Sequence, residues 1–158
     1  MEFQVRKATK NDMPSVLKLI NELAVYEREP DAVEVTVADL ERDGFGDQPL
    51  FNCFVAEAED KIVGMALFYN RYSTWKGKTI HLEDLIVNED YRGKGIGMQL
   101  YKKVMQFALE ENIKRVEWVV LDWNTPAVNF YKNTGASVFS EWDTVQFDQD
   151  SIKKFLNL

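Results

Sequence analysis

The fold of this chain is decided by the stretch Val87-Asn88-Glu89-Asp90-Tyr91-Arg92-Gly93-Lys94-Gly95-Ile96-Gly97. An apolar run typical of a β-strand leads into it, and a helical pattern of apolar residues follows at residues 96–111. Three glycines therefore stand where a helix begins, where backbone N–H groups lack intrahelical partners and the macrodipole is positive. We expect this turn to bind a pyrophosphate, with Arg92 and Lys94 adding positive charge.

The spacing of the glycines excludes two common nucleotide motifs. No Gly-Lys-Ser/Thr follows the turn, as a P-loop requires, and the three glycines are evenly spaced, unlike those of the dinucleotide-binding fingerprint. A short glycine pattern also fits an ordinary connection between a strand and a helix. The ligand must therefore be inferred from the rest of the chain.

Composition narrows the class of protein. A chain of 158 residues that is 46% hydrophobic suits a single packed domain, residues 1–158. With 19 basic and 26 acidic residues the net charge is −7, which argues against nucleic acid and favours cationic ligands. The single cysteine excludes an internal disulfide and a cysteine-based zinc site, and we expect no metal. No apolar stretch reaches membrane-spanning length, so we expect a cytoplasmic chain without a membrane partner.

The apolar periodicity predicts a mixed α/β domain in the order β-α-α-β-β-β-α-β-α-β-β. Thr9 with Asp12, and Thr36 with Asp39, form cap pairs for two helices that end near Tyr26 and at Gly44. The other elements are strands at residues 3–6, 51–58, 62–72, 79–87 and 115–121, helices at 96–111 and 124–135, two short strands within 137–147, and a last amphipathic turn at 150–156. Because a helix joins the fourth strand to the fifth, these two strands can lie parallel and splay apart.

A second informative block runs through residues 121–136 and contains Asn124-Thr125-Pro126-Ala127-Val128-Asn129-Phe130-Tyr131. Taken alone, it fits an ordinary amphipathic helix with Phe130 and Tyr131 in the core. Its order Asn-x-x-Ala-x-x-Phe-Tyr-x-x-x-Gly-Ala, together with Arg92-x-x-Gly95-x-Gly97, resembles the two signatures of the GNAT N-acetyltransferases. Two such blocks in this order make a chance match improbable.

Other motifs are similar to those of one branch of that superfamily. Asp43-Gly44-Phe45-Gly46-Asp47-x-Pro49, Cys53-Phe54-Val55-Ala56-Glu57 and Leu82-Glu83-Asp84 resemble the diamine acetyltransferases. The segment of residues 72–80 resembles the thialysine N-ε-acetyltransferase branch in particular. The likeness covers residues 3–147. The chain departs from it at His81, where these relatives usually carry Tyr, and in a shorter turn at residues 59–61.

The resemblance implies a GNAT fold, in which a mixed sheet of about seven strands splays between the fourth and fifth and is flanked by helices. It also implies acetyl-CoA as cosubstrate and a homodimer. Backbone groups of Leu85, Ile86 and Val87 would bind the pantetheine arm. The turn Arg92, Gly93, Lys94, Gly95, Ile96, Gly97 and Met98 would hold the pyrophosphate, and Asn124, Thr125, Pro126, Ala127 and Tyr131 would line the other side of the cofactor.

Acetylation of an amine sets clear demands on a site. An alkyl amine is protonated at neutral pH, so the site must hold a cation, remove a proton and later protonate the leaving thiolate. The resemblance assigns amine binding and proton removal to Glu83, and Tyr131 is the best candidate general acid. Each residue also has a plain reading, Glu83 as an exposed strand residue and Tyr131 as a core phenol. Asp84 would alternate to the opposite face of a regular strand and is ranked lower.

The resemblance places further substrate contacts at two places, Tyr26 with Glu27, and Glu117 with Trp118 and Val119. For Glu27 a merely solvated helix-end carboxylate is an equal alternative. We interpret Cys53 as a buried inert thiol, and His81 more readily as a strand residue than as a catalytic one. The role of Trp75 stays open.

The sequence thus predicts an N-acetyltransferase that uses acetyl-CoA and acts on a small cationic amine, such as thialysine, a lysine-like amino acid, a diamine or a polyamine. Two alternatives stay open. One is an acetyltransferase for lysine or N-terminal amines of proteins, and the other is a non-catalytic CoA-binding sensor.

Overall fold

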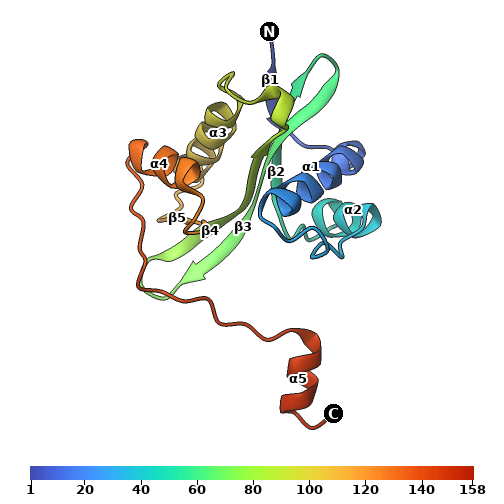
Figure 1. Ribbon diagram of the computed structural model, residues 1–158, viewed down its shortest axis with the longest axis vertical. Coiled ribbons are helices and arrows are strands. Elements are labelled where there is room, and N and C mark those ends of the chain that lie inside the picture. Colours follow the sequence, from blue (N-terminus) through green and yellow to red (C-terminus); the bar gives the residue numbers. More distant parts are fainter. The chain divides into compact units, whose positions relative to one another are not determined.

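The computed structural model describes residues 1–158, which form two compact units, Met1–Val119 and Val120–Leu158. The first unit is built on a five-stranded sheet in the order β1-β2-β3-β4-β5 (Figure 1). Its strands are β1 (Gln4–Lys7), β2 (Asn52–Ala58), β3 (Lys61–Ser73), β4 (Gly77–Val87) and β5 (Val116–Glu117). The pairs from β1 to β4 are antiparallel, and β5 runs parallel to β4, so the sheet is mixed as predicted.

The number of strands differs from the prediction of about seven. Residues 137–147, for which two strands were expected, form none, and the fifth strand is shorter than the expected 115–121. The alternation of apolar and polar residues in a segment shows that it could fit a sheet, but a strand exists only where a neighbour supplies its hydrogen bonds. A local pattern cannot specify that neighbour.

Helices cover both faces of the sheet within the first unit. They are η1 (Lys10–Asp12), α1 (Met13–Tyr26), α2 (Val37–Phe45), η2 (Glu89–Tyr91) and α3 (Ile96–Glu110). Figure 1 shows α1 and α2 on one side of the sheet and α3 on the other. Two separate apolar cores result, one on each face. On the α3 side the rings of Phe54, Phe68 and Phe107 pack with centroids 5.0–6.3 Å apart.

Caps fix the helix starts on the α1 side. The Asp12 carboxylate accepts hydrogen bonds from the Thr9 N–H and hydroxyl, and it forms a two-bond ion pair with Arg6 at 2.7 and 3.0 Å. This pairing holds the pKa of Asp12 below its usual range.

The helix α2 continues to Phe45 instead of ending at the predicted Gly44. A Cβ at Gly44 would lie 2.4 Å from the ring of Phe51, so packing requires this glycine.

A bulge in the ladder between β3 and β4 decides which side chains reach the α1 face. Leu67 pairs with Asp84 and Phe68 pairs with Leu82, which leaves Glu83 as the extra residue. Before the bulge Leu82 packs in the α3-side core, and after it Leu85 packs in the same core three residues later. The alternation therefore shifts by one residue, and Glu83 and Asp84 both belong to the α1 face.

The second unit contains α4 (Thr125–Asn133) and α5 (Gln149–Phe155). The Asn124 side chain accepts a hydrogen bond from the Ala127 N–H at 3.4 Å and caps α4, with Pro126 in the first turn. Asp148 caps α5 through the Ser151 N–H at 2.8 Å. Across the whole chain, no helix combines the length and apolar character needed to cross a membrane.

Candidate functional site

The glycine turn has the backbone geometry expected of an anion site. Gly93 and Gly95 have φ angles of +75° and +83°, a region that favours glycine, and a Cβ at either would meet nothing within 4 Å. Gly95 is the N-cap of α3. The backbone N–H groups from Lys94 to Met98 donate to no protein acceptor. Several backbone donors therefore lack a protein partner at a positive helix end.

The side chains of the two basic residues of the turn, Arg92 and Lys94, contact other parts of the protein. Arg92 Nε donates to the Val87 carbonyl at 2.9 Å, its Nη2 lies 3.6 Å from Glu22, and its guanidinium lies 5.6 Å from the centre of the Tyr26 ring. Lys94 Nζ donates to the Asp90 carbonyl at 3.1 Å. Arg92 therefore connects the turn to the end of α1 through these contacts, and it also contributes a positive charge to the turn.

The strand that leads into the turn has one edge without a partner. The ladder between β4 and β5 pairs only Ile80 with Val116 and His81 with Glu117. Beyond His81 the strand β4 continues to Val87 with β3 alone as its partner. The backbone of Leu85, Ile86 and Val87 therefore has no partner strand on its second side, although the Val87 carbonyl accepts from Arg92 and the side chains of Ile86 and Val87 are buried.

Glu83 is the most exposed carboxylate of this strand, with half of its side-chain surface open to solvent. The Tyr69 phenol donates to Glu83 Oε2 at 2.9 Å, and His81 Nε2 lies 3.6 Å from the same oxygen. The other oxygen, Oε1, has no protein partner. Burial and the bond to Glu83 raise the pKa of Tyr69 to about 12, so the phenol stays a hydrogen-bond donor at neutral pH.

Asp84 corrects the prediction from strand alternation. The bulge brings Asp84 to the same face as Glu83 instead of the opposite one, and its side chain has no hydrogen bond or ion pair. Burial, followed by the charges of Glu83 and Glu27, raises the pKa of Asp84 to about 6. Sequence alone missed this neighbour because a bulge depends on the partner strand.

The end of α1 adds a third carboxylate. Glu27 is the C-cap residue of α1, and burial together with the nearby charge of Glu83 raises the pKa of Glu27 above its usual range. Tyr26, the last residue of α1, is 41% exposed and contacts Arg92. Glu27, Glu83 and Asp84 thus form one acidic group on the α1 face, as needed to attract a cation.

The other predicted substrate contacts, residues 117–119, do not form a group of unpaired carboxylates like that around Glu83. The Glu117 carboxylate forms ion pairs with Arg71 and Arg115, each at 2.9 Å, and the Arg115 contact lacks hydrogen-bond geometry. The Trp118 ring packs edge-on against Tyr101 in the α3-side core, and Val119 is exposed. Glu117 is therefore already neutralised by two cations, and Trp118 belongs to the opposite face.

In the second unit, the predicted cofactor residues lie at the start of α4. Asn124 is its N-cap, Thr125 and Pro126 begin it, and Ala127 donates to the cap. Tyr131 is half-buried in the second turn, with its ring 5.6 Å from that of Phe130. The main-chain carbonyl of Tyr131 accepts from the Thr134 hydroxyl at 2.7 Å.

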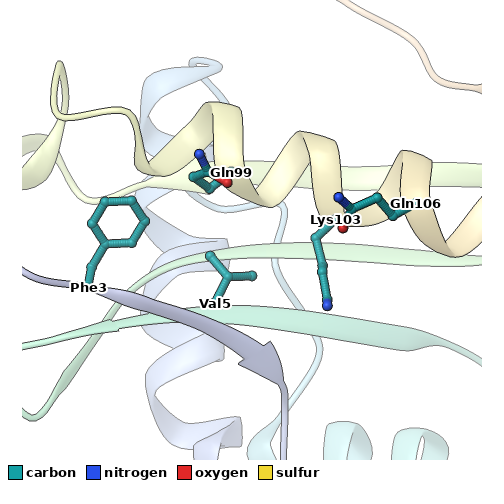
Figure 2. Close-up of a pocket in the computed structure, with 5 residues that line it drawn as sticks. All are labelled: Phe3, Val5, Gln99, Lys103 and Gln106. Carbon is teal, nitrogen blue, oxygen red and sulfur yellow. The ribbon is translucent and has the colours of Figure 1, made fainter.

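Three other features lie outside the acidic group and the glycine turn. Cys53 is 4% exposed, which confirms the predicted burial, and burial with nearby carboxylates raises its pKa to about 12, which disfavours the thiolate. An open depression of about 360 Å³ lies between β1 and α3, where Phe3, Val5, Gln99, Lys103 and Gln106 line it (Figure 2). It is on the α3 face near β1, away from Glu83 on β4. Trp75 is 83% exposed in the turn between β3 and β4.

Two known acetyltransferases are similar in sequence to the chain over most of its length. Thialysine N-epsilon-acetyltransferase of Bos taurus is 38% identical over 161 residues, which cover 95% of this chain and 95% of that protein. Spermidine/spermine N(1)-acetyltransferase-like protein 1 of Homo sapiens is 39% identical over 160 residues. That match covers 95% of this chain, but the chain spans only 23% of the length of that relative.

Solved structures show the same fold. An integron cassette protein from the mobile metagenome of V. cholerae superposes with a TM-score of 0.81 at 26% identity and covers 100% of this chain and 99% of that one. An aminoglycoside acetyltransferase from an uncultured soil metagenomic sample has a TM-score of 0.77 at 21% identity, over 92% of this chain and 95% of that one. The sequence profile described as Acetyltransferase (GNAT) family matches residues 13–136. The resemblance seen in the motifs is thereby confirmed, and the chain belongs to the GNAT family of acetyltransferases.

Proposed function

We propose that this acetyltransferase uses acetyl-CoA and transfers the acetyl group directly to the primary amine of a small cationic substrate. Thialysine, a lysine-like amino acid, a diamine or a polyamine would fit. The observation that carries the proposal is the continuity of one strand, since β4 presents Glu83 on an acidic face and then runs into the positive-φ glycine turn of α3. An amine site and a pyrophosphate site would be joined by one short, rigid element.

The cofactor would be held mainly by backbone groups. The unpaired N–H groups from Lys94 to Met98 fit a pyrophosphate, and glycines at 93 and 95 allow it a close approach. The free edge of β4 at Leu85, Ile86 and Val87 would pair with the amides of pantetheine as another strand would. Asn124, Thr125, Pro126 and Ala127 would complete the cofactor site. When bound, acetyl-CoA supplies the thioester that carries the acetyl group.

Glu83 would bind the substrate ammonium and remove its proton, directly or through one water. Its Oε2 is occupied by Tyr69, so Oε1 is the oxygen available to the amine or the water. Glu27 and Asp84 would add negative charge, and Tyr26 with Glu117 and Val119 would form the remaining substrate contacts, whereas the ring of Trp118 packs in the α3-side core away from Glu83. Because Glu117 is paired with two arginines, we assign it to the wall of the site rather than to the cation.

Tyr131 would act as general acid. As the nitrogen–carbon bond forms and the carbon–sulfur bond breaks, its phenol would give a proton to the departing sulfur, and a solvent proton would restore it. The role rests on the resemblance of the block Asn124 to Tyr131 and on the family match, which runs across both units of the chain. That continuous match also supports residues 1–158 as one functional domain. We further propose a homodimer, on the resemblance alone.

One panel of amines tests the function. The full-length chain would be incubated with acetyl-CoA and thialysine, lysine, putrescine, spermidine, spermine or a lysine peptide, and CoA thiol release would be followed. We expect turnover with at least one small amine and little with the peptide. Preference for the peptide would favour protein acetylation, and tight acetyl-CoA binding without turnover would favour a sensor.

A single substitution tests the general acid. Tyr131→Phe should lower kcat by about 100-fold, while acetyl-CoA still binds with nearly unchanged Kd, because only proton donation is lost. Tyr91→Phe is a matched control, since it removes a phenol that donates to Glu59 on the surface. An unchanged kcat in Tyr131→Phe would overturn the role of Tyr131.

A further inference from the structure

Three side chains form a row across the sheet beside Glu83. Tyr69 on β3 pairs with His81 on β4, and His81 pairs with Glu117 on β5, so the three share one face. The rings of Tyr69 and His81 lie with centroids 5.4 Å apart and an interplanar angle of 33°. The His81 side chain is only 11% exposed. Its ring therefore has a fixed place against its neighbours.

The two nitrogen atoms of His81 face groups of opposite character. Arg71 Nη1 lies 3.5 Å from Nδ1, and Glu83 Oε2 lies 3.6 Å from Nε2. A guanidinium can only donate, so Nδ1 must be the accepting nitrogen of the neutral ring. The ring proton of the neutral form would then be on Nε2, which lies 3.6 Å from Glu83 Oε2.

Arg71 is itself held in place. Its guanidinium forms an ion pair with Glu117 at 2.9 Å, and Glu117 is also paired with Arg115. A chain of contacts thus runs from the arginines through the imidazole to the carboxylate. Each link is electrostatically matched, since a cation faces Nδ1 and an anion faces Nε2–H.

We infer that His81 is a positioning residue for Glu83, with its tautomer set by Arg71. The Tyr69 phenol donates to Glu83 Oε2 and His81 Nε2 lies 3.6 Å from the same oxygen, which leaves Oε1 without a protein partner. The inference rests on the proposed function, because it assigns Oε1 to the amine. It also explains how the chain can carry His at this position, since an imidazole offers a second donor to Glu83.

The tautomer can be observed without any activity. His81 is the only histidine in the chain, so a long-range ¹H–¹⁵N spectrum of the ¹⁵N-labelled protein shows a single imidazole. In the neutral state we expect the Nε2–H tautomer, with Nδ1 unprotonated. Arg71→Met should increase the population of the other tautomer, whereas Arg115→Met, which removes the second partner of Glu117, should not. A neutral Nδ1–H ring in the parent protein would overturn the inference, even if amines are acetylated.

Kinetics test the positioning itself. His81→Phe keeps a ring against Tyr69 but loses the donor, and it should lower kcat/KM for the amine about threefold to tenfold with the KM for acetyl-CoA unchanged. His81→Gln keeps an amide donor near the place of Nε2 and should recover most of that loss. Equal activity of the two variants, or an equal change in the KM for acetyl-CoA, would contradict the role. Thermal unfolding of both variants checks that each is folded at the assay temperature.

Discussion

Asp84 lies directly opposite Leu67 in the ladder between β3 and β4, and both side chains are on the face of the sheet that α1 covers. A carboxyl group in such a place is costly to ionise, because burial removes its water and Glu83 and Glu27 add negative charge. Ionisation of Asp84 at neutral pH therefore lowers the free energy of unfolding of the protein.

Asp84→Asn should stabilise the protein at high pH. The folded-state pKa of Asp84, about 6, is raised above its usual value, so stability contributed by the protonated group is present at low pH and is lost as the pH rises through 6. We expect the variant to exceed the parent by about 2 kcal/mol in free energy of unfolding at pH 8 and by little at pH 4. Urea unfolding at both pH values measures the difference. The control is Asp47→Asn at an exposed site, and a gain independent of pH would contradict the prediction.

Two glycines of the turn should respond to alanine with opposite signs. Gly95 has a φ of +83°, so Gly95→Ala should lower the free energy of unfolding by about 1 kcal/mol although no atom lies within 4 Å of the new Cβ. Gly97 lies in the first turn of α3, and its added Cβ would contact Val87 at an ordinary 3.6 Å. Gly97→Ala should therefore raise stability by up to about 1 kcal/mol. Thermal or urea unfolding of both variants measures the two changes in stability, and losses of equal size would contradict the prediction.

Cys53 should be unreactive until the protein unfolds. The thiol is 4% exposed and its pKa is raised to about 12, so almost no thiolate exists at pH 8. We expect no release of the chromophore from a disulfide reagent such as DTNB with the native protein on the scale of minutes. One equivalent should be released rapidly in concentrated guanidinium. Fast reaction of the native protein would reveal a path for solvent into the α1-side core.

The local elements were predictable because their signals are local. The helix expected at residues 96–111 is observed as Ile96–Glu110, since a glycine turn and an apolar stripe define it without reference to the rest of the chain. The strands expected at residues 51–58 and 62–72 left a short connection at 59–61, and the structure has a tight turn at Glu59 and Asp60 between β2 and β3. Both residues take positive φ there, which fits a short hairpin connection.

The arrangement around Glu83 was predictable only in part. Glu83 was identified by its motif, but Tyr69, Arg71 and the placement of Asp84 depend on the register between β3 and β4, and a bulge changes that register without a sequence signal. The hairpin at Ser73–Gly77 does place Tyr69 and His81 opposite each other, so a count outward from the turn could have found that pair. The missing strands at residues 137–147 depend on a neighbour in the same way.

The bulge also makes the side chain at position 83 independent of the strand pairing and core packing around it. Leu67 pairs with Asp84 and Phe68 pairs with Leu82, so Glu83 between them has no partner on β3. Its side chain belongs to neither apolar core. A change at this position alters what the face offers to a ligand while the register of β3 and β4 is kept. Substitutions at position 83 can therefore change which ligands this face prefers without a compensating change in either apolar core.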